Sequence, residues 1–422
     1  MYINEEQRQT AVLVGVYTGE YDVDVSLDEL EELANTAGAE VVAKFVQKMN
    51  SINHPNYHSA TYVRSGKLEE IKHFCEMQQI DLLIFDDELT GIQLRNIEQI
   101  TNVRVIDRTM LILDIFAMRA SSKEGKLQVE LAQQKYLMPR LIGLGTVLSR
   151  QAGGIGTRGP GETKLESDRR HIRRRIDKLT QELQELERQR ERTRQRRRKN
   201  SVITVAIVGY TNVGKSTLLN ALTNAGVLEK NQLFATLDPT ARELKLPDGQ
   251  KVVLIDTVGF INRLPHQLVE AFQSTLEEAA SADLILNVCD ISNPMMEQQL
   301  EVTKSILNDL GCAETPMLTV YNKTDLYQWQ SMATITNKSV FISAKQNKGI
   351  DDLLNAICKQ LAEQIRTMDL LIPYTEGALL DKIRRFGKII QEDYQTEGVC
   401  VRANIDIKML KLVAPYVIES DK

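Results

Sequence analysis

Short apolar runs alternate with stretches of helical spacing over residues 11–107. The runs AVLVGVY, EVVAKFV, DLLIFDD and VRVID are rich in β-branched residues and have strand length. Between them, SLDELEELANTAG, SGKLEEIKHFCEMQQ and TGIQLRNIEQIT have apolar positions at helical intervals. This alternation predicts a small parallel α/β subdomain, to which we assign residues 1–106. Ser26, with Glu29 three residues later, is a candidate capping box for the first helix.

A second region, residues 107–199, has the pattern of two long helices around a glycine-rich segment. The first helix is predicted from Asp107 to about Leu137, where Pro139 would stop it. Residues 143–161 then contain seven glycines in nineteen positions, which a packed helix does not tolerate. Helical spacing resumes after them, at Leu165, Ile172, Ile176, Leu179, Leu183 and Leu186. We expect an antiparallel helical hairpin with residues 140–164 as its tip loop.

Residues 200–366 have the alternating pattern of a doubly wound α/β domain. Apolar strands are predicted at VITVAIVG, KVVLID, DLILNVCD, PMLTVYN and SVFIS, with helical segments between them. The remaining residues, 367–422, have the order strand, helix, strand, strand, helix, which predicts a small α+β tail domain. The fold class is therefore α/β multidomain, in which a parallel-sheet domain follows the α/β subdomain and the hairpin.

Composition and charge add a polyanion contact to this picture. The chain has 422 residues, a net charge of -5 and 42% hydrophobic residues, which is typical of globular proteins. Residues 164–199 contain 15 basic and 7 acidic side chains, so this stretch carries +8 and the rest -13. The arginine-rich RQRERTRQRRRKN is thus a candidate polyanion contact, with a solvated helix face or a linker as the alternative.

Cysteine usage and hydropathy predict a protein of the cytoplasm. The five cysteines form no CxxC pair, so we expect reduced thiols packed as small apolar groups. No basic segment leads into an apolar stretch at the amino terminus, and no run has the roughly 18 apolar residues of a membrane span. We expect no stable membrane association, and a monomer.

The first chemical motif lies between a predicted strand and a predicted helix. Residues 209–216, GYTNVGKS, fit the phosphate-binding pattern GxxxxGK[ST]. Backbone N–H groups there surround phosphates, Lys215 reaches the β and γ phosphates, and the Ser216 hydroxyl binds Mg2+. The candidate nucleotide-binding residues of this loop are Gly209, Tyr210, Thr211, Asn212, Val213, Gly214, Lys215, Ser216 and Thr217.

Two further segments are candidates for sensing the γ phosphate. The segment DTVG follows the strand KVVLID, where the aspartate can hold Mg2+ through water and Gly259 can donate its N–H to the γ phosphate. The segment FATLDPT, residues 234–240, contains the suitable threonines, and we favour Thr236 over Thr240 as a Mg2+ ligand beside Ser216. The nucleotide-binding candidates here are Phe234, Ala235, Thr236, Leu237, Asp238, Asp256, Thr257, Val258 and Gly259. Lys215, Thr236 and Gly259 are the candidate catalytic residues.

The base is expected to be guanine. NKTD follows an apolar strand, where the Asp325 carboxylate can accept from both the ring N–H and the exocyclic amine of guanine, a donor pair that adenine lacks. SAK follows the strand SVFIS, where a backbone N–H can meet the guanine carbonyl. The candidates are Asn322, Lys323, Thr324, Asp325, Ser343, Ala344 and Lys345.

These motifs, in this order, resemble the translation-factor-like class of P-loop GTPases. The segments GGIGTRGPGETKLESDRR, GYTNVGKSTLLNAL, FATLDPT and DTVGF, with the arginine-rich helix, resemble the HflX family in particular. The resemblance covers nearly the whole chain and is weakest at residues 1–60 and in the tail. It implies a Mg2+-dependent GTPase that binds the large (50S) ribosomal subunit and its rRNA and helps to dissociate ribosomes under stress.

Several points stay open at this stage. A basic helix and a tip with Arg140, Arg150 and Arg158 but no acid fit an rRNA-walled site, although a disordered linker would also explain the glycines. The alternative function is a nucleotide-stabilised RNA-binding or ribosome-assembly scaffold with incidental GTP turnover. Phe260 stands where many related GTPases have a water-orienting glutamine, which predicts slow intrinsic hydrolysis. Asn212 resembles an asparagine that binds K+ in some GTPases; shaping of the loop is its alternative role.

Overall fold

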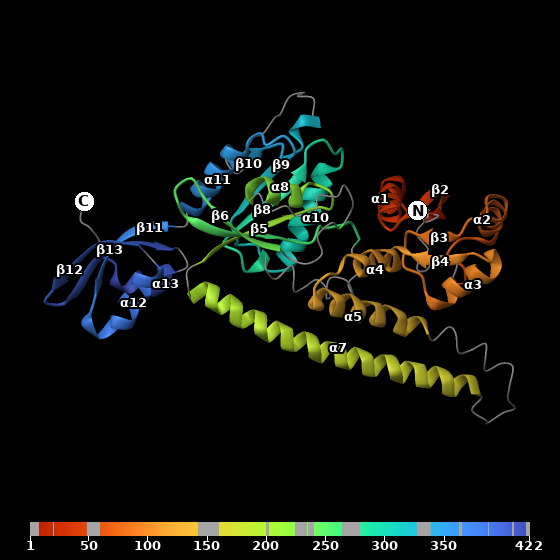
Figure 1. Cartoon of the computed structure of the whole chain (residues 1–422), viewed down its shortest axis with the longest axis horizontal. Helices are drawn as coiled ribbons and strands as arrows, with labels where there is room; N and C mark the ends of the chain where they lie inside the picture. The colour runs from red at the N-terminus through yellow and green to blue at the C-terminus, as the bar shows by residue number, and fades with distance from the viewer. Residues whose placement is uncertain are drawn as a thin grey trace, which may run out of the picture. The chain divides into compact units, whose positions relative to one another are not determined.

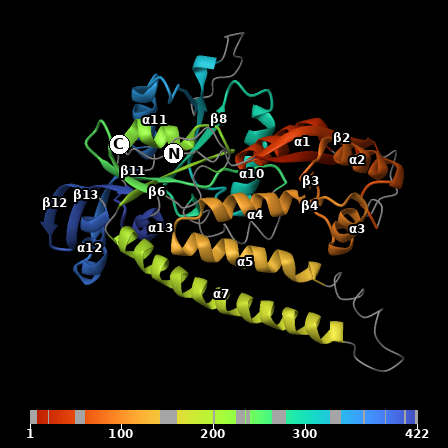
Figure 2. The same cartoon turned by 45° about the vertical axis from the view of Figure 1, so that its right-hand side comes forward.

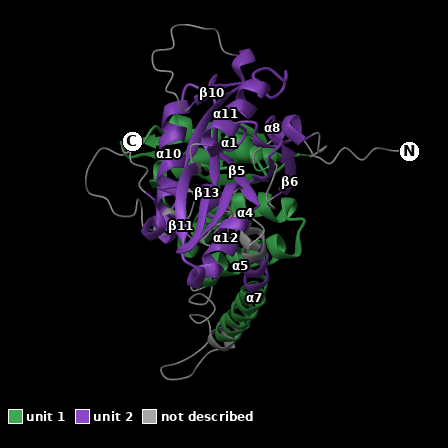
Figure 3. Cartoon of the chain, turned by 90° about the vertical axis from the view of Figure 1, so that its left-hand side faces the viewer, with its two compact units in different colours: residues 1–186, 230–238, 258–274 green, residues 187–229, 239–257, 275–422 purple. Residues whose placement is uncertain are grey.

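A computed structural model describes residues 8–19, 21–48, 60–141, 160–199, 202–223, 234, 240–263, 279–326, 339–362, 365–386, 388–406 and 409–418. The contacts divide the chain into two compact units (Figure 3). Unit 1 comprises Met1–Leu186, Lys230–Asp238 and Val258–Ser274. Unit 2 comprises Glu187–Glu229, Pro239–Thr257 and Thr275–Lys422.

Unit 1 contains a four-stranded, fully parallel sheet in the order β2-β1-β3-β4, which confirms the predicted subdomain (Figure 1). The strands are β1 (Gln9–Tyr17), β2 (Ala39–Lys48), β3 (Leu82–Phe85) and β4 (Arg104–Asp107). The helices between and after them are α1 (Val23–Thr36), α2 (Ser65–Gln78), α3 (Gly91–Thr101) and α4 (Arg108–Arg119).

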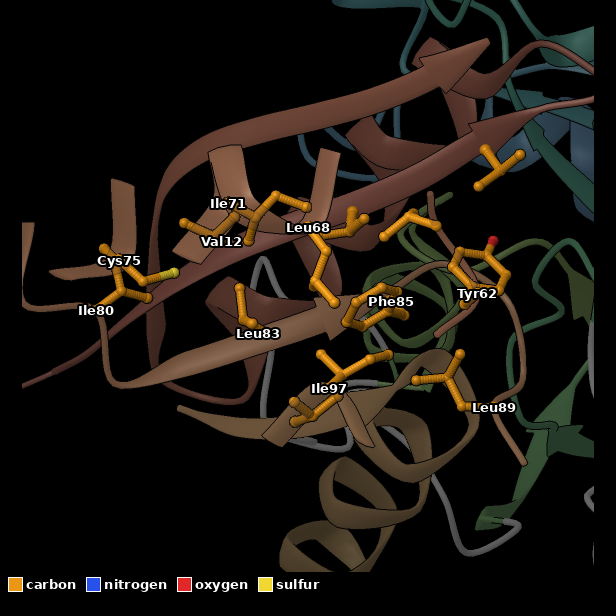
Figure 4. Close-up of a cluster of buried hydrophobic side chains, with 14 residues drawn as sticks. Val12, Tyr62, Leu68, Ile71, Cys75, Ile80, Leu83, Phe85, Leu89 and Ile97 are labelled. Atoms are coloured by element: carbon orange, nitrogen blue, oxygen red, sulfur yellow. The ribbon is translucent and has the colours of Figure 1, made fainter. Parts of the chain in front are cut away.

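Apolar residues of alternating strand positions and helix faces form the core of this sheet. On one face, Val12 and Phe85 pack with Leu68 and Ile71 of α2 and Ile97 of α3 (Figure 4). The opposite face is covered by α1, because a Cβ placed on Gly15 would lie 3.2 Å from a methyl carbon of Leu27. Burial on both faces explains why the inner strands β1 and β3 are continuous apolar runs.

The start of helix α1 differs from our prediction. The capping box at Ser26 and Glu29 is wrong: α1 begins three residues earlier, and its N-cap is Asp22, which accepts from two backbone N–H groups. Ser26 lies inside the helix, where its hydroxyl donates to Asp86 at 2.7 Å. A capping box does exist at α3, where Thr90 is the N-cap.

The predicted helix from Asp107 to Leu137 is also wrong, because two helices occupy this region. After α4 the backbone at Ala120 is extended, and Ser122 then caps α5 (Lys123–Arg140) by accepting from the Gly125 N–H. Pro139 lies within the last turn of α5 and does not stop it.

The helix α7 (Pro160–Lys199) lies antiparallel to α5 in both views, as the predicted hairpin requires (Figures 1 and 2). Arg175 of α7 and Glu130 of α5 form a two-bonded ion pair at 2.6 and 2.7 Å. The apolar positions of α7 face inward: Leu179 is fully buried, and Ile172 and Ile176 are half-buried. Arg140, which we expected in the tip, is instead the last residue of α5 and pairs with Glu88 and Asp107. Arg150 and Arg158 of the predicted tip lie outside the described residues.

Unit 2 contains a six-stranded sheet in the order β10-β9-β8-β5-β7-β6, which confirms the doubly wound domain. Its strands are β5 (Ile203–Gly209), β6 (Thr240–Lys245), β7 (Lys251–Asp256), β8 (Leu284–Asp290), β9 (Met317–Asn322) and β10 (Ser339–Phe341). All neighbours are parallel except β6, which pairs antiparallel with β7 and was not predicted. The helices are α8 (Lys215–Thr223), α10 (Met296–Asp309) and α11 (Ile350–Ala362), with a 3-10 turn at Thr324–Leu326.

Unit 2 ends in a three-stranded antiparallel sheet in the order β11-β13-β12. The elements are β11 (Ile365–Ile372), α12 (Gly377–Phe386), β12 (Lys388–Gln395), β13 (Gly398–Asp406) and α13 (Leu410–Val413), with 3-10 turns at Tyr374–Glu376 and Ala414–Tyr416. This order is the predicted one. Its first strand begins at Ile365, two residues before the boundary that we assigned from the sequence.

Candidate nucleotide site

The predicted nucleotide motifs of unit 2 follow neighbouring parallel strands. Because β5, β7, β8, β9 and β10 are parallel, their carboxyl ends lie at one edge of the sheet, where ligands bind in folds of this type. The loop of residues 209–216 follows β5, Asp256 ends β7, and Asn322 ends β9. The structure thus brings together at this edge the motifs that the sequence separates by more than a hundred residues.

Two positions of the phosphate-binding loop require glycine, because other parts of the domain lie too close to leave room for a side chain. Gly209 has a φ of 148°, and a Cβ there would lie 2.1 Å from the Val288 carbonyl oxygen. Gly214 has a φ of 93°, and its Cβ would lie 2.5 Å from Nδ2 of Asn322. Any larger residue would displace β8 or the Asn322 side chain, so the loop conformation depends on both glycines.

Lys215, the first residue of α8, lies beneath this loop. Its ammonium group donates to the carbonyl oxygens of Gly209 at 3.0 Å and Tyr210 at 2.7 Å. Burial lowers the pKa of Lys215 to about 8, although the charge of Asp256 acts in the opposite direction. A buried ammonium group at a helix amino terminus produces the positive potential that phosphate groups require.

Ser216 and Asp256 provide a pair of oxygen donors beside Lys215. The Ser216 hydroxyl donates to Oδ2 of Asp256 at 3.0 Å, and Asp256 is fully buried at the end of β7. No group of three or more His, Cys, Asp or Glu in the described residues could hold a metal. Two oxygen ligands nevertheless fit Mg2+, which keeps several water ligands and binds phosphate oxygens as well.

Asn322 connects three motifs through its side-chain amide. Its Nδ2 donates to the Val213 carbonyl of the phosphate-binding loop at 2.9 Å. Its Oδ1 accepts from the Ala344 N–H of the SAK segment at 3.0 Å. The residue is 2% exposed, so both bonds are shielded from water. Asn322 is therefore a structural clamp between these loops.

Side-chain contacts hold Asp325 and Lys323 of the first base-reading segment. The Ser343 hydroxyl donates to Oδ1 of Asp325 at 2.5 Å. Lys323, which has a φ of 62°, pairs with Asp290 at 2.7 Å. Sequence reasoning missed Asp290, although an aspartate at the end of the strand DLILNVCD was its signal. The backbone of Thr324 is bonded to the Ile342 carbonyl, and Lys345 is exposed.

The structure describes only part of the segments that we predicted to sense the γ phosphate. Ala235, Thr236, Leu237 and Asp238 lie outside the described residues. Thr257 donates its hydroxyl to the Ile207 carbonyl at 2.8 Å, which fixes the end of β7 against β5. Phe234, Val258 and Gly259 belong to unit 1.

Comparison with known proteins agrees with this geometry. The family models described as GTP-binding GTPase N-terminal, GTP-binding GTPase Middle Region and 50S ribosome-binding GTPase match residues 24–117, 119–197 and 204–323. The chain is 51% identical to the GTPase HflX of Caldanaerobacter subterraneus subsp. tengcongensis, over 97% of this chain and 94% of that protein. This chain belongs to the HflX family. It is a GTPase and binds guanine nucleotides.

One further relative and one solved structure are also similar to this chain. The GTPase HflX of Escherichia coli strain K12 is 41% identical, over 94% of this chain and 93% of that protein. The crystal structure of a GTP-binding protein from the archaeon Sulfolobus solfataricus in complex with GDP is 26% identical, with a TM-score of 0.44, and covers 83% of this chain and 98% of that chain. In the described part of this HflX-family chain, no helix is both long and apolar enough to cross a membrane.

Proposed function

We propose that GTP binds at the carboxyl edge of the six-stranded sheet, with its phosphates on the loop of residues 209–216. The backbone N–H groups of that loop and the Lys215 ammonium group bind the phosphates. Ser216, together with Asp256 through water, holds Mg2+, which neutralises charge on the β and γ phosphates when it is bound. The main support is the side chain of Asn322, which ties the phosphate-binding loop to both base-reading segments.

In this site Asp325 reads the guanine base. Its carboxylate accepts the ring N–H and the exocyclic amine, while the Ser343 hydroxyl keeps it oriented. A backbone N–H of the segment Ser343 to Lys345, which Asn322 holds through the Ala344 N–H, meets the guanine carbonyl. The γ phosphate is contacted by the Gly259 N–H and by Thr236, so that these two segments distinguish GTP from GDP.

Hydrolysis by this site alone is slow. Phe260, which follows DTVG, is 3% exposed and has no group that could orient water. A partner that supplies a charge or a water-positioning group accelerates such GTPases by about three to five orders of magnitude. We assign this role to the ribosome.

The partner that we propose is the large ribosomal subunit. One family model that matches the chain is described as a 50S ribosome-binding GTPase. The side chains of Arg173, Arg174, Arg188 and Arg192 on α7 are exposed, which fits contacts with rRNA phosphates. We propose that the GTP-bound protein, a cytoplasmic monomer, binds this subunit, dissociates ribosomes and is released by hydrolysis.

A variant that changes the preferred base tests this proposal. In Asp325→Asn the amide can donate to a carbonyl, so xanthine, which has a carbonyl where guanine has its amine, becomes the preferred base. We expect the wild-type protein to cosediment with large subunits and dissociate ribosomes with a non-hydrolysable GTP analogue. Asp325→Asn should do both only with the corresponding xanthine nucleotide.

The same experiment distinguishes an enzyme from a scaffold. Ribosome dissociation by Lys215→Ala at the wild-type level would favour the scaffold, in which nucleotide turnover is incidental. If neither the wild-type protein nor Lys215→Ala binds or dissociates ribosomes, the large subunit is not the partner. The GTPase assignment would still stand. Thermal unfolding of each variant controls for loss of fold.

A further inference from the structure

Asp290 lies beside the first base-reading segment, although it belongs to none of the nucleotide motifs. It ends β8, and the strand register pairs it with Asn322, the last residue of β9. Its Oδ2 lies 2.7 Å from the Lys323 ammonium group. The Asp290 side chain is 12% exposed and that of Lys323 25%, so solvent screens this ion pair only in part. A charge at the end of one strand therefore holds the first residue after its neighbour.

The Asp290 carboxylate is itself fixed by the loop that follows β8. Its Oδ1 accepts from the Ser292 N–H at 3.0 Å and from the Ser292 hydroxyl at 2.6 Å. In the same loop, the Ile291 N–H donates to the Asn322 carbonyl at 3.1 Å, which continues the contact between the two strands. One carboxylate oxygen is thus held by Ser292, and the other faces Lys323.

Lys323 connects β9 to the turn that contains Asp325. Its φ of 62° lies in the left-handed region, which non-glycine residues adopt mainly where contacts hold them. The Leu326 N–H donates to the Lys323 carbonyl at 3.0 Å, which closes the turn around Thr324 and Asp325. The direction in which this turn presents Asp325 therefore depends on the conformation of Lys323.

We propose that Asp290 is a positioning residue for guanine recognition: its ion pair holds Lys323 in the left-handed conformation and so orients the Asp325 carboxylate toward the base. This inference rests on the role proposed above for Asp325. Two parallel hydrogen bonds to one carboxylate require a defined orientation of both oxygens. A group that is already oriented before the ligand arrives binds it at a lower entropic cost.

The diphosphates of guanosine and inosine test this role, because the inosine base lacks only the exocyclic amine. GDP therefore offers Asp325 two donors and IDP offers one. In purified full-length Asp290→Asn, without ribosomes, we expect the preference for GDP over IDP to fall by about threefold, within the range set by a partly exposed ion pair. Competition against a fluorescent guanine nucleotide measures both affinities.

Two further variants act on the same contacts. Lys323→Met, which keeps the length of the side chain but not its charge, should lower the preference by a similar factor. The double variant of Asp290→Asn and Lys323→Met should not exceed the larger single effect, because both changes remove one ion pair. Ser292→Ala should act in the same direction but less, since Asp290 keeps its pair with Lys323.

Asp283→Asn is the matched control. Asp283 precedes β8 at the opposite end of the same strand and accepts from the Thr204 N–H at 2.8 Å, so its replacement should leave the preference unchanged. Thermal unfolding of each variant separates loss of fold from loss of recognition. If Asp290→Asn does not fold, Lys323→Met takes its place in the test.

The outcome for Asp325→Asn separates this inference from the proposed site. A preference for GDP that is unchanged or larger in Asp290→Asn, but lost in Asp325→Asn, overturns the inference while the site stands. An equal fall in Asp283→Asn also overturns it, because the effect would then not depend on Lys323. If Asp325→Asn keeps the wild-type preference, Asp325 does not read the amine and the proposed base-reading role itself fails.

Discussion

At the scale of single residues, Lys215 gives the nucleotide site a dependence on pH. Its pKa is lowered to about 8 by burial, so the free protein loses this charge as the pH rises through that value. Phosphate groups bind the charged form and raise the pKa again, so protonation and nucleotide binding are linked. Between about pH 7 and about pH 8.5 we expect the affinity for GTP to fall about fourfold.

Equilibrium titration with a fluorescent GTP analogue at constant ionic strength measures this effect. Guanosine, which has the base without the phosphates, is the control ligand and should show no such fall. If the affinity for GTP stays as constant between these pH values as that for guanosine, Lys215 does not lose its charge there. Other groups would then offset the lowering of its pKa by burial.

Asn212 has two candidate roles: it shapes the phosphate-binding loop, or its side chain binds K+. Its φ of 61° lies in the left-handed region, which asparagine and glycine adopt more readily than other residues. This observation favours loop shaping over K+ binding. We expect Asn212→Gly to keep GTP affinity within about threefold and Asn212→Val, which is β-branched, to lose about tenfold or more.

Rates measured in sodium and potassium buffers complete that comparison. Loop shaping predicts equal stimulation by the two ions in wild type and in Asn212→Gly. Stimulation by K+ that disappears in Asn212→Gly would instead identify the side chain as a cation ligand.

At the scale of elements, the capping box of α3 is expected to stabilise the N-terminal sheet. The Gln93 N–H donates to the Thr90 hydroxyl oxygen at 3.3 Å, and the Gln93 side chain accepts from the Thr90 N–H at 2.9 Å. Thr90→Ala should cost about 0.5–2 kcal/mol of local stability. Amide hydrogen exchange within α3 measures it. Thr36→Ala, in the last turn of α1, is the control and should change exchange little.

The elements that the sequence failed to predict share a physical cause. Strand β6, TARELK, lies at a sheet edge and is mostly exposed, so it lacks the apolar alternation by which strands are recognised. The helix breaks at Ala120 because Ser122 caps the start of α5. The apolar positions keep helical spacing across this point, so the break could not be recognised from them. Buried parallel strands such as β3 and β8 were predicted because burial on both faces requires apolar runs.

In the candidate site, likewise, residues of local motifs could be predicted from the sequence, whereas pairings between distant residues could not. The glycines, Lys215 and Asn322 were named as candidates because they belong to local motifs, whereas the clamp that the Asn322 side chain forms was not predicted. The pairing of Asp290 with Lys323, and that of Asp86 with Arg263, join residues far apart in the sequence. Only the three-dimensional fold places such partners together, and a single sequence contains no direct signal of these pairings.

At the scale of the whole molecule, the basic helix α7 is the surface that we expect to set the dependence of ribosome binding on salt. Arg173 and Arg174 are exposed, whereas the neighbouring Arg175 is paired with Glu130 of α5. Each arginine on an rRNA phosphate releases counterions, so the logarithm of affinity falls linearly with the logarithm of salt concentration.

Replacement of both Arg173 and Arg174 by alanine should therefore weaken binding to large subunits and flatten that slope by about one for each lost phosphate contact. Cosedimentation over a series of potassium salt concentrations, with a non-hydrolysable GTP analogue present, gives the slope. The control is Arg175→Ala, which should lower hairpin stability but leave the slope unchanged, since Glu130 already neutralises that side chain. Weaker binding with an unchanged slope in the double variant would mean that these arginines contact protein or support the fold, and that other residues bind the rRNA.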